Sequence, residues 1–170
     1  AAIQERTTKR AAQAKEEEKM SALQALLKPV SEAFRAKKWD LVLSEADKVE
    51  KAQPDALPYL TNFRVMAMVQ SNNAGLGAYL RSLLSVSEIG KTPDLLNQYA
   101  WMVVEKDLKL NSDAYAAASE LMEKAMSLDP NNGMNMDTLA LAYWRRGDKA
   151  KALATQTKAI ELASKQSGVP

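Results

Sequence analysis

The chain has 170 residues, of which 46% are hydrophobic and 26% are charged, and its net charge at neutral pH is +2. This composition is typical of a soluble globular domain, and so small a net charge does not by itself indicate a nucleic-acid-binding protein. Cysteine and histidine are both missing, which excludes an internal disulfide, a thiolate nucleophile, a histidine general base and a zinc site with the usual ligands.

Residues 1–20 are charged, rich in alanine and free of glycine and proline. They favour a helix but sustain no apolar stripe, which predicts a solvated helical lead-in or a linker from a preceding domain. The chain begins at Ala1 with no apolar segment typical of a signal peptide. We therefore interpret it as an excised or processed piece.

Apolar residues recur at helical spacing from Met20 to Phe34, which predicts an amphipathic helix. Pro29 falls inside this pattern, so the helix is expected to kink there or to restart with Pro29 in its first turn. Lys37 and Lys38 form the next joint. A second amphipathic helix is expected from Trp39 to Pro54.

Two further helices are expected between residues 57 and 90, separated by a turn at residues 71–73. Leu76, Leu80, Leu83 and Leu84 continue the apolar period after that turn. Thr92 is then expected to cap the following helix, with Pro93 in its first position. A longer loop at residues 106–112 precedes a helix over residues 114–128.

Residues 129–162 predict two antiparallel helices with a sharp joint at Gly147 and Asp148. Gly147 suits a left-handed helix end, and Asp148 can cap the amides that follow. The apolar face of the first helix comprises Met136, Leu139, Ala140 and Tyr143. The corresponding face of the second helix comprises Ala152, Leu153, Ala159, Ile160 and Leu162. The polar tail from Ser164 to Pro170 is expected to fray.

Corresponding positions recur along these helix pairs. The central residues of the first helices are Val30, Arg64, Ala100 and Ala140, at spacings of 34, 36 and 40 residues. The second helices align at Val42, Leu76, Ala118 and Ala152. This pattern resembles the tetratricopeptide repeat (TPR), a helix–turn–helix unit of about 34 residues. Leu139, Ala140, Tyr143, Gly147, Asp148, Ala152 and Ala159 carry the resemblance in the last unit.

The resemblance implies an all-α fold in which antiparallel helix pairs stack as a short right-handed TPR-like superhelix of about three to four degenerate repeats. The expected organisation is a lead-in over 1–20 and a repeat domain over 21–170, with units near 21–54, 57–90, 93–130 and 133–163. Three features depart from the pattern. Gln156 stands where an aromatic is usual, Arg64 where a small residue is usual, and Pro29 interrupts the first unit.

A second similarity lies in LNQYAW (residues 96–101), DTLA (137–140) and GDKAKALATQTKAIE (147–161). These segments resemble the helical C-terminal extension of certain bacterial thioredoxin-like redoxin proteins. That resemblance implies an accessory domain that positions an upstream redox domain without contributing chemistry. It would also imply the cell envelope or periplasm, whereas the cytoplasm is expected otherwise.

In stacked repeats the first helices line a concave surface that commonly binds ligands. We expect a groove for a peptide or a neighbouring domain, lined by Asn62, Val65, Met68, Asn97, Gln98, Trp101, Asp137, Leu141, Trp144 and Arg145. Two tryptophans among apolar residues suit a peptide with apolar anchors. An alternative is that Trp101 and Met68 only pack between repeats. Asn97, Gln98, Asp137 and Thr138 are expected to form a hydrogen-bonded network between first helices.

The sequence predicts a non-catalytic scaffold without a cofactor or a metal. It contains no glycine-rich phosphate loop, and its longest apolar runs are too short to span a membrane. A carboxylate pair in the long third loop is conceivable but poorly placed for catalysis. The basic cluster at Arg145, Arg146, Lys149 and Lys151 is expected to be a solvated face, with a phosphate-binding adaptor as the alternative. An apolar end of the array would permit self-association.

Overall fold

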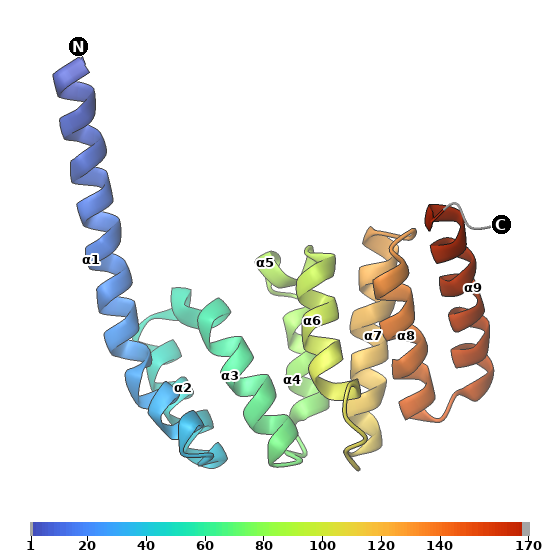
Figure 1. Ribbon diagram of the computed structural model, residues 1–170. Helices are drawn as coiled ribbons and strands as arrows, with labels where there is room; N and C mark the ends of the chain where they lie inside the picture. Colours follow the sequence, from blue (N-terminus) through green and yellow to red (C-terminus); the bar gives the residue numbers. More distant parts are fainter. Residues whose placement is uncertain (1, 168–170) are drawn as a thin grey trace. The chain divides into compact units, whose positions relative to one another are not determined.

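Helices form all the regular secondary structure that the computed structural model describes, which covers residues 2–167 (Figure 1). This confirms the predicted all-α fold. In chain order the elements are α1 (Ala2–Arg35), α2 (Trp39–Ala52), the short 3-10 helix η1 (Pro54–Ala56), α3 (Leu57–Gln70), α4 (Leu76–Leu83), α5 (Ser87–Gly90), α6 (Pro93–Val104), α7 (Ser112–Leu128), α8 (Gly133–Arg146) and α9 (Lys149–Ser167).

The helices belong to two compact units, an N-terminal unit (Ala1–Arg64) and a C-terminal unit (Val65–Pro170). The boundary between them falls inside α3. Each unit has buried apolar residues of its own.

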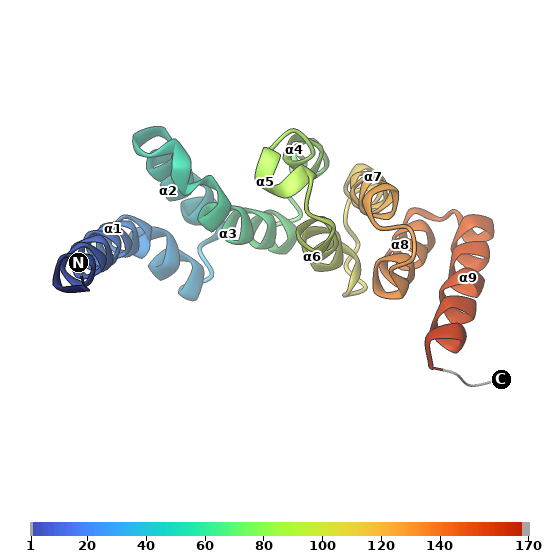
Figure 2. The same ribbon diagram turned by 90° about the horizontal axis from the view of Figure 1, so that it is seen from above.

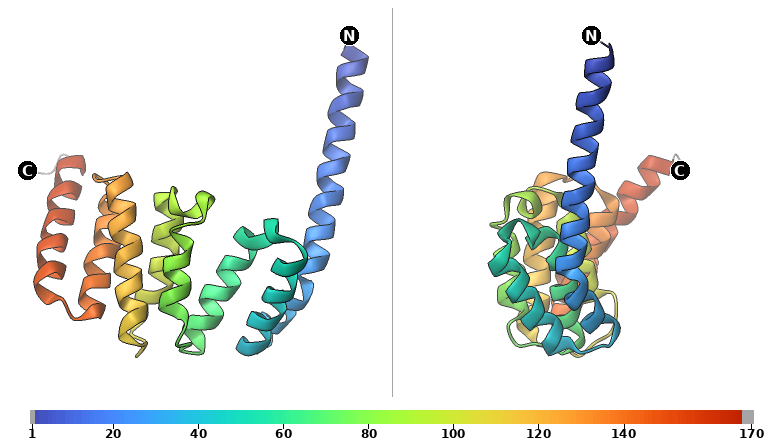
Figure 3. Two further views of the ribbon diagram at one scale, coloured as in Figure 1. Left: turned by 180° about the vertical axis from the view of Figure 1, so that it is seen from behind. Right: turned by 90° about the vertical axis from the view of Figure 1, so that its left-hand side faces the viewer.

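Helix α1 is longer than expected, because it passes through Pro29 without interruption. The expected restart at Pro29 is therefore wrong. Proline removes one backbone donor, which leaves the carbonyl of Ala25 without its helical partner. Both Ala25 and Pro29 are exposed, so water can solvate that carbonyl. Figure 3 shows the first half of α1 extending beyond α2, which agrees with the exposed side chains at residues 9–22.

Aromatic rings organise the core of the N-terminal unit. The ring of Phe34 packs edge-on against Trp39 and Phe63, at centroid distances of 5.6 and 5.3 Å. Arg64, which departs from the small residue usual at its position, is buried and bound by two acids of α2. Its guanidinium lies 2.8 Å from Asp47 Oδ1 and 2.6 Å from Glu50 Oε2. At the position of Arg64, ion pairs with Asp47 and Glu50 thus replace the close packing of a small side chain.

The C-terminal unit is built from two layers of antiparallel helices. Figure 2 shows α6 and α8 in one layer and α4 and α7 in the other. Each successive pair packs closely, α6 on α7, α7 on α8 and α8 on α9, while α4 packs on α7 and α6 on α8. Leu80, Leu96, Leu121 and Met122 are fully buried at the centre of this unit. The repeated positions Ala100, Ala140, Leu76, Ala118 and Ala152 are buried as well.

The second helix of the second pair is shorter than its apolar period suggests. Helix α4 ends at Leu83, and the single turn of α5 follows after a short bend. Gly90 permits this bend, because a Cβ there would stand only 2.1 Å from the carbonyl oxygen of Leu84. The sequence did not predict this separate turn.

Positive φ angles mark the joints that the sequence predicted. Lys37 has a φ of 55°, Asn72 a φ of 48° and Gly147 a φ of 91°. The turns at residues 37–38 and 71–73 and the left-handed end of α8 are thus confirmed. The expected Thr92 cap is wrong in one respect. Thr92 occupies the cap position, but its hydroxyl donates to the Glu88 carbonyl at 2.7 Å and does not bind an amide of α6.

The long loop between α6 and α7 is held at both ends. Asn111 caps α7 by accepting a hydrogen bond from the Ala114 amide at 2.8 Å. The hydroxyl of Tyr115 donates to the carbonyl of Leu108. The loop also meets the α3–α4 turn, where Asn72 Nδ2 donates to the Lys109 carbonyl at 3.4 Å. At the other end of the chain, α9 continues to Ser167. The expected fraying from Ser164 is therefore wrong as far as that residue, and residues 168–170 lie outside the described part.

Candidate functional site

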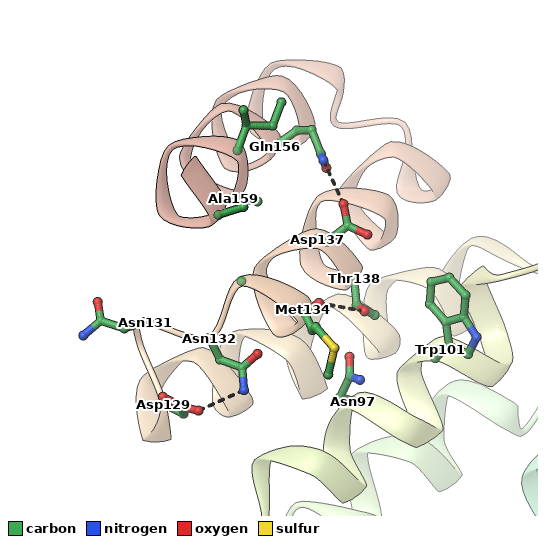
Figure 4. Close-up of a pocket in the computed structure, with 13 residues that line it drawn as sticks. Asn97, Trp101, Asp129, Asn131, Asn132, Met134, Asp137, Thr138, Gln156 and Ala159 are labelled. Atoms are coloured by element: carbon green, nitrogen blue, oxygen red, sulfur yellow. Dashed lines mark hydrogen bonds between the residues drawn. The ribbon is translucent and has the colours of Figure 1, made fainter. Parts of the chain in front are cut away.

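Two adjoining hollows lie between α6, α8 and α9 in the C-terminal unit. Figure 4 shows residues that line the larger one. We call the two hollows together the C-terminal groove. The larger hollow encloses about 870 Å³ and is lined by Asn97, Trp101, Asp129, Asn131, Asn132, Gly133, Met134, Asp137, Thr138, Gln156, Ala159, Ile160 and Ala163.

The smaller hollow encloses about 370 Å³ and has mainly apolar walls. It is lined by Trp101, Asp137, Ala140, Leu141, Trp144, Lys149, Ala152, Leu153 and Gln156. Trp101, Asp137 and Gln156 line both hollows, so they mark the place where the two meet.

The start of α8 forms one edge of the groove. Asn132 caps this helix, because its Oδ1 accepts a hydrogen bond from the Asn135 amide at 3.1 Å. The same side chain donates from Nδ2 to Asp129 Oδ2 at 3.0 Å. These two bonds fix the chain just before α8, and Met134 follows with 73% of its surface exposed.

The joint between α8 and α9 positions the opposite wall. Gly147 ends α8 in the left-handed conformation, and Asp148 Oδ1 then accepts a hydrogen bond from the Lys151 amide at 3.2 Å. This confirms the predicted cap. The turn sends α9 back along α8, with Ala140 and Ala152 buried. Small side chains at these positions allow the two helices to approach closely.

A hydrogen bond crosses from α8 to α9 where the two hollows meet. Gln156 Nε2 donates to Asp137 Oδ1 at 2.8 Å, and Figure 4 shows the two side chains facing each other. Gln156 occupies the position where the tetratricopeptide repeat, which the sequence resembles, usually has an aromatic residue. Here the position carries an amide that binds the carboxylate on the groove wall.

Two tryptophans present their rings at the groove. Trp101 on α6 is 39% exposed, and Trp144 on α8 is 54% exposed. The Nζ of Lys149 lies 5.6 Å from the ring centroid of Trp144, within the range of a cation–π interaction. Leu141 is half-buried between the groove and the core. Both tryptophans are exposed, so packing within the chain does not cover either of them completely.

The structure brings five of the ten predicted groove residues together. Those that line the groove are Asn97, Trp101, Asp137, Leu141 and Trp144. Gln98 is exposed on α6 outside the lining, and Met68 packs partly buried against the core. Asn62 is exposed and belongs to the N-terminal unit. The placement of Val65 is corrected, because its side chain is fully buried in the core and offers no surface to a partner.

The placement of Arg145 is also corrected. Its Nε donates to the carbonyl of Val104 at 3.0 Å, and its Nη1 is paired with Asp107. The side chain is mostly buried by these contacts. Arg145 therefore anchors the α6–α7 loop to α8, and it does not line the C-terminal groove.

The basic cluster around the α8–α9 joint makes several contacts within the chain. Arg146 Nη1 donates to Ser119 Oγ at 2.9 Å, and its guanidinium lies 5.1 Å from the ring centroid of Tyr143. Lys151 also approaches that ring, at 5.4 Å. The expectation of a solvated basic face is wrong for Arg145 and Arg146, because buried acceptors and rings engage them. These contacts also leave less of the cluster available for a phosphate ligand.

Two residues of the predicted hydrogen-bonded network, Asp137 and Thr138, bind partners outside that network. Asp137 is bound by Gln156 of α9, and Thr138 donates to the Met134 carbonyl of its own helix at 3.2 Å. Asn97 Oδ1 is buried and accepts no hydrogen bond from any residue that the structure describes. Figure 4 shows the Asn97 side chain beside the end of Met134.

The helical period of the sequence predicted the wrong face for two apolar residues of α9. Leu153 is 72% exposed and Ile160 is 59% exposed, although both were expected on the inward face. Ala152 and Ala159, which were expected on the same face, are buried. Helix α9 packs mainly on α8, so only a narrow stripe of its surface is covered. The spacing of seven residues between the two alanines was the signal for that stripe.

Tyr143 fixes α8 against α7 behind the groove. Its hydroxyl donates to Glu123 Oε1 at 2.9 Å. Burial, reinforced by this hydrogen bond, raises the pKa of Tyr143 to about 12. Its phenol therefore stays neutral at physiological pH and serves as a fixed donor between the two helices.

The groove offers amides, carboxylates and aromatic rings for binding. Among the side chains that the structure describes within residues 2–167, no group of three or more acids is arranged to hold a metal ion. Over the same range, no helix combines the length and apolar character needed to cross a membrane. The chemistry on the groove walls is that of recognition by hydrogen bonds and apolar contact.

Equivalent positions are buried in successive helix pairs, and a groove lies beside the last pair. This arrangement defines an all-α helical repeat. The sequence profile of the tetratricopeptide repeat matches residues 136–166. These residues, from α8 and α9, are a tetratricopeptide repeat, a unit that typically mediates contacts between proteins.

Comparison with curated proteins gave no significant match. Comparison with solved structures gave none either. The similarity to the redoxin extension therefore has no support from relatives, and it stays a prediction.

Proposed function

We propose that the chain is a non-catalytic interaction module whose C-terminal groove holds a segment of a partner protein. The observation that carries this proposal is that two exposed tryptophans, Trp101 and Trp144, line one apolar hollow. Tryptophan contributes more than most residues to protein interfaces when a partner covers it. Large apolar area that is open to water favours such burial.

The walls of the smaller hollow support an apolar anchor in the partner. Leu141 and Leu153 face this hollow together with Trp144. Its volume of about 370 Å³ is of the size that receives side chains or small ligands. The larger hollow adds amide groups from Asn131 and Asn132, which can bind a peptide backbone. A short extended or helical segment of a protein fits this combination.

We further propose that the module comprises four repeat units near 21–54, 57–90, 93–130 and 133–163. The order of the helices supports it. The pairs α3 and α4, and α6 and α7, fall within the second and third ranges. Helices α2 and α8 fall within the first and fourth, while α1 begins before the first range and α9 ends four residues after the fourth. The direct profile match covers part of the fourth unit.

The groove is tested by selecting short random peptides on the immobilised chain and measuring the affinity of the selected peptides by calorimetry. Trp144→Ala should weaken binding by about 1–3 kcal/mol, because the ring would lose its contact with the peptide. Thermal unfolding should be almost unchanged, since this ring is half exposed.

Tyr59→Ala is the matched control, because Tyr59 is an aromatic residue of similar exposure, 48%, in the N-terminal unit. It should leave peptide binding unaltered. If Trp144→Ala unfolds the domain, or if Tyr59→Ala weakens binding as much, the groove is not the binding site.

A further inference from the structure

The charges along the C-terminal groove are unevenly distributed. Asp129 and Asp137 line the larger hollow, and the described residues of its lining include neither lysine nor arginine. Lys149 is the single cation among the described residues that line the smaller hollow, and it lies over the ring of Trp144. The chain carries a net charge of +2, so the larger hollow has the opposite sign to the chain as a whole.

Asp137 is the acid placed to meet a partner. It is exposed, it lines both hollows, and its hydrogen bond comes from the neutral amide of Gln156. Other acids of the same unit are neutralised by arginine. Asp107 pairs with Arg145, and Asp113 pairs with Arg81 at 2.9 Å. The charge of Asp137 has no such cation among the ion pairs of the described residues.

An aromatic face lies near this carboxylate. Trp101 lines both hollows together with Asp137 and is partly exposed. A carboxylate beside a tryptophan face suits a lysine or arginine side chain, because the carboxylate binds its N–H groups while the ring attracts its charge. The position of Lys149 over Trp144 shows the same kind of contact within the chain.

Asn97 independently indicates that a partner supplies a hydrogen-bond donor to the groove. Its Oδ1 is buried at the larger hollow and accepts no hydrogen bond from the described part of the chain. Buried acceptors normally have a donor. Figure 4 shows Asn97 between Trp101 and Met134. Since Met134 is 73% exposed, its flexible side chain can move to admit a donor from a partner.

We propose that the partner of the C-terminal groove is a basic, apolar peptide segment. A lysine or arginine of that segment lies against Asp137 and the face of Trp101, and a neighbouring apolar side chain enters the smaller hollow. This inference rests on the proposed function and deepens it. An acidic segment is disfavoured, because its carboxylates would face Asp129 and Asp137 across a partly desolvated site.

The first experiment sequences the peptides selected on the immobilised full chain from a random peptide library. Selected peptides should be enriched in lysine or arginine next to a large apolar residue. Replacing that basic residue with glutamine should weaken binding roughly three- to tenfold, and replacing it with glutamate should weaken it further. Enrichment of acidic or uncharged peptides would overturn the proposal.

The second experiment changes the charge of the groove without removing its hydrogen bond. In Asp137→Asn the amide oxygen still accepts from Gln156, so the change isolates the charge. Affinity for a selected basic peptide should fall roughly three- to tenfold, and its dependence on salt should become weaker. Glu88→Gln is the matched control, because it removes one charge at an exposed position on α5 outside the groove. It should leave the affinity unchanged.

A charge exchange makes the assignment specific. Asp137→Lys should bind the basic peptide worse than the wild-type chain does, and it should recover binding to the glutamate version of that peptide. An equal loss for both peptides would contradict direct pairing. Circular dichroism and thermal unfolding show whether each variant keeps its fold.

The outcomes separate this inference from the function on which it rests. Binding that needs Trp144 but is indifferent to Asp137→Asn would overturn the basic-peptide inference alone. Loss of concentration-dependent self-association in Trp144→Ala, with no peptide selected, would identify a second copy of the chain as the occupant. That result would overturn the basic-peptide inference together with the proposed peptide partner.

Discussion

Asp113 of α7 lies directly against Gly77 of α4. A Cβ built on Gly77 would stand 2.0 Å from Asp113 Oδ2 and 2.9 Å from its backbone oxygen. Arg81, one turn after Gly77, holds the same carboxylate and also binds Glu120. The hydrogen bonds to Glu120 and Asp113 raise the pKa of Arg81 above its ordinary value. Close contact and charge pairing thus join α4 to α7 at the same place.

Gly77→Ala should destabilise the C-terminal unit by about 1–3 kcal/mol, because the added methyl group overpacks this contact. The Asp113 side chain can rotate away, but its backbone oxygen cannot move without shifting α7. The free energy of unfolding from urea denaturation measures the effect.

Gly133→Ala is the matched control, because nothing lies within 4 Å of a Cβ at Gly133 and its φ is not positive. Its effect on stability should stay within about 0.5 kcal/mol. Equal losses for the two variants would mean that contact between α4 and α7 is not the cause.

The Arg145 side chain should control the mobility of the α6–α7 loop. Arg145→Ala removes its bonds to the Val104 carbonyl and to Asp107. We expect a loss of about 1–3 kcal/mol, since a buried acceptor loses a charged donor. Amide hydrogen exchange over residues 105–111 should become faster.

Lys106→Ala is the control for this loop, because Lys106 is an exposed cation within it. It should change neither stability nor exchange by much. Unchanged exchange in Arg145→Ala would show that other contacts, such as that of Tyr115 with Leu108, are sufficient to hold the loop.

The Asp113 carboxylate should make stability depend on acid pH. The hydrogen bond from Arg81 is the main cause that holds the pKa of Asp113 below its ordinary value of 3.8. The folded state therefore binds this proton less tightly than the unfolded chain does. Stability from the pair is present above about pH 4 and is lost as the pH falls through the lowered pKa.

Comparison with Asp113→Asn separates this carboxylate from the others. The difference in unfolding free energy between wild type and variant should be largest near neutral pH and shrink below about pH 4. A difference that stays constant across this range would exclude Asp113 as the titrating group.

The exposed leucine of α9 should contribute little to stability. Leu153→Ala should change the free energy of unfolding by less than about 0.5 kcal/mol, because Leu153 is 72% exposed. Leu121→Ala, the same change at a fully buried residue, should cost about 2–5 kcal/mol.

Leu153→Lys should in addition reduce any self-association that sedimentation detects at high concentration, because it places a charge on the exposed apolar face. A large loss of stability in Leu153→Ala would mean that α9 is covered in the folded protein.

Local signals in the sequence predicted the helices and their joints well. Gly147 and Asp148 marked the last joint, because only certain residues tolerate a left-handed helix end or cap the next helix. Of the two outcomes expected at Pro29, the restart is wrong, since an exposed proline can remain inside a helix whose freed carbonyl faces water. The sequence also indicated five residues of the groove, among them both tryptophans.

The remaining groove residues depended on contacts between distant parts of the chain. The helical period placed Val65 and Arg145 on the groove side together with Trp101. In the structure Val65 lies in the core, and Arg145 binds the end of α6 and the α6–α7 loop. Periodicity gives the face of a helix but not the neighbour that will cover it. Met134 and Ile160 entered the groove because α8 and α9 leave them uncovered.

The sequence by itself determined the helical class, the repeat and its joints, because these depend on short-range spacing and backbone preference. Only the tertiary structure decided which polar groups are neutralised within the chain. Arg145 is bound to Asp107, whereas Asp137 meets only the amide of Gln156 among its described contacts. Such pairings join residues far apart in the sequence. Their energies depend on the distance between the charges and on burial, and a local sequence pattern gives neither.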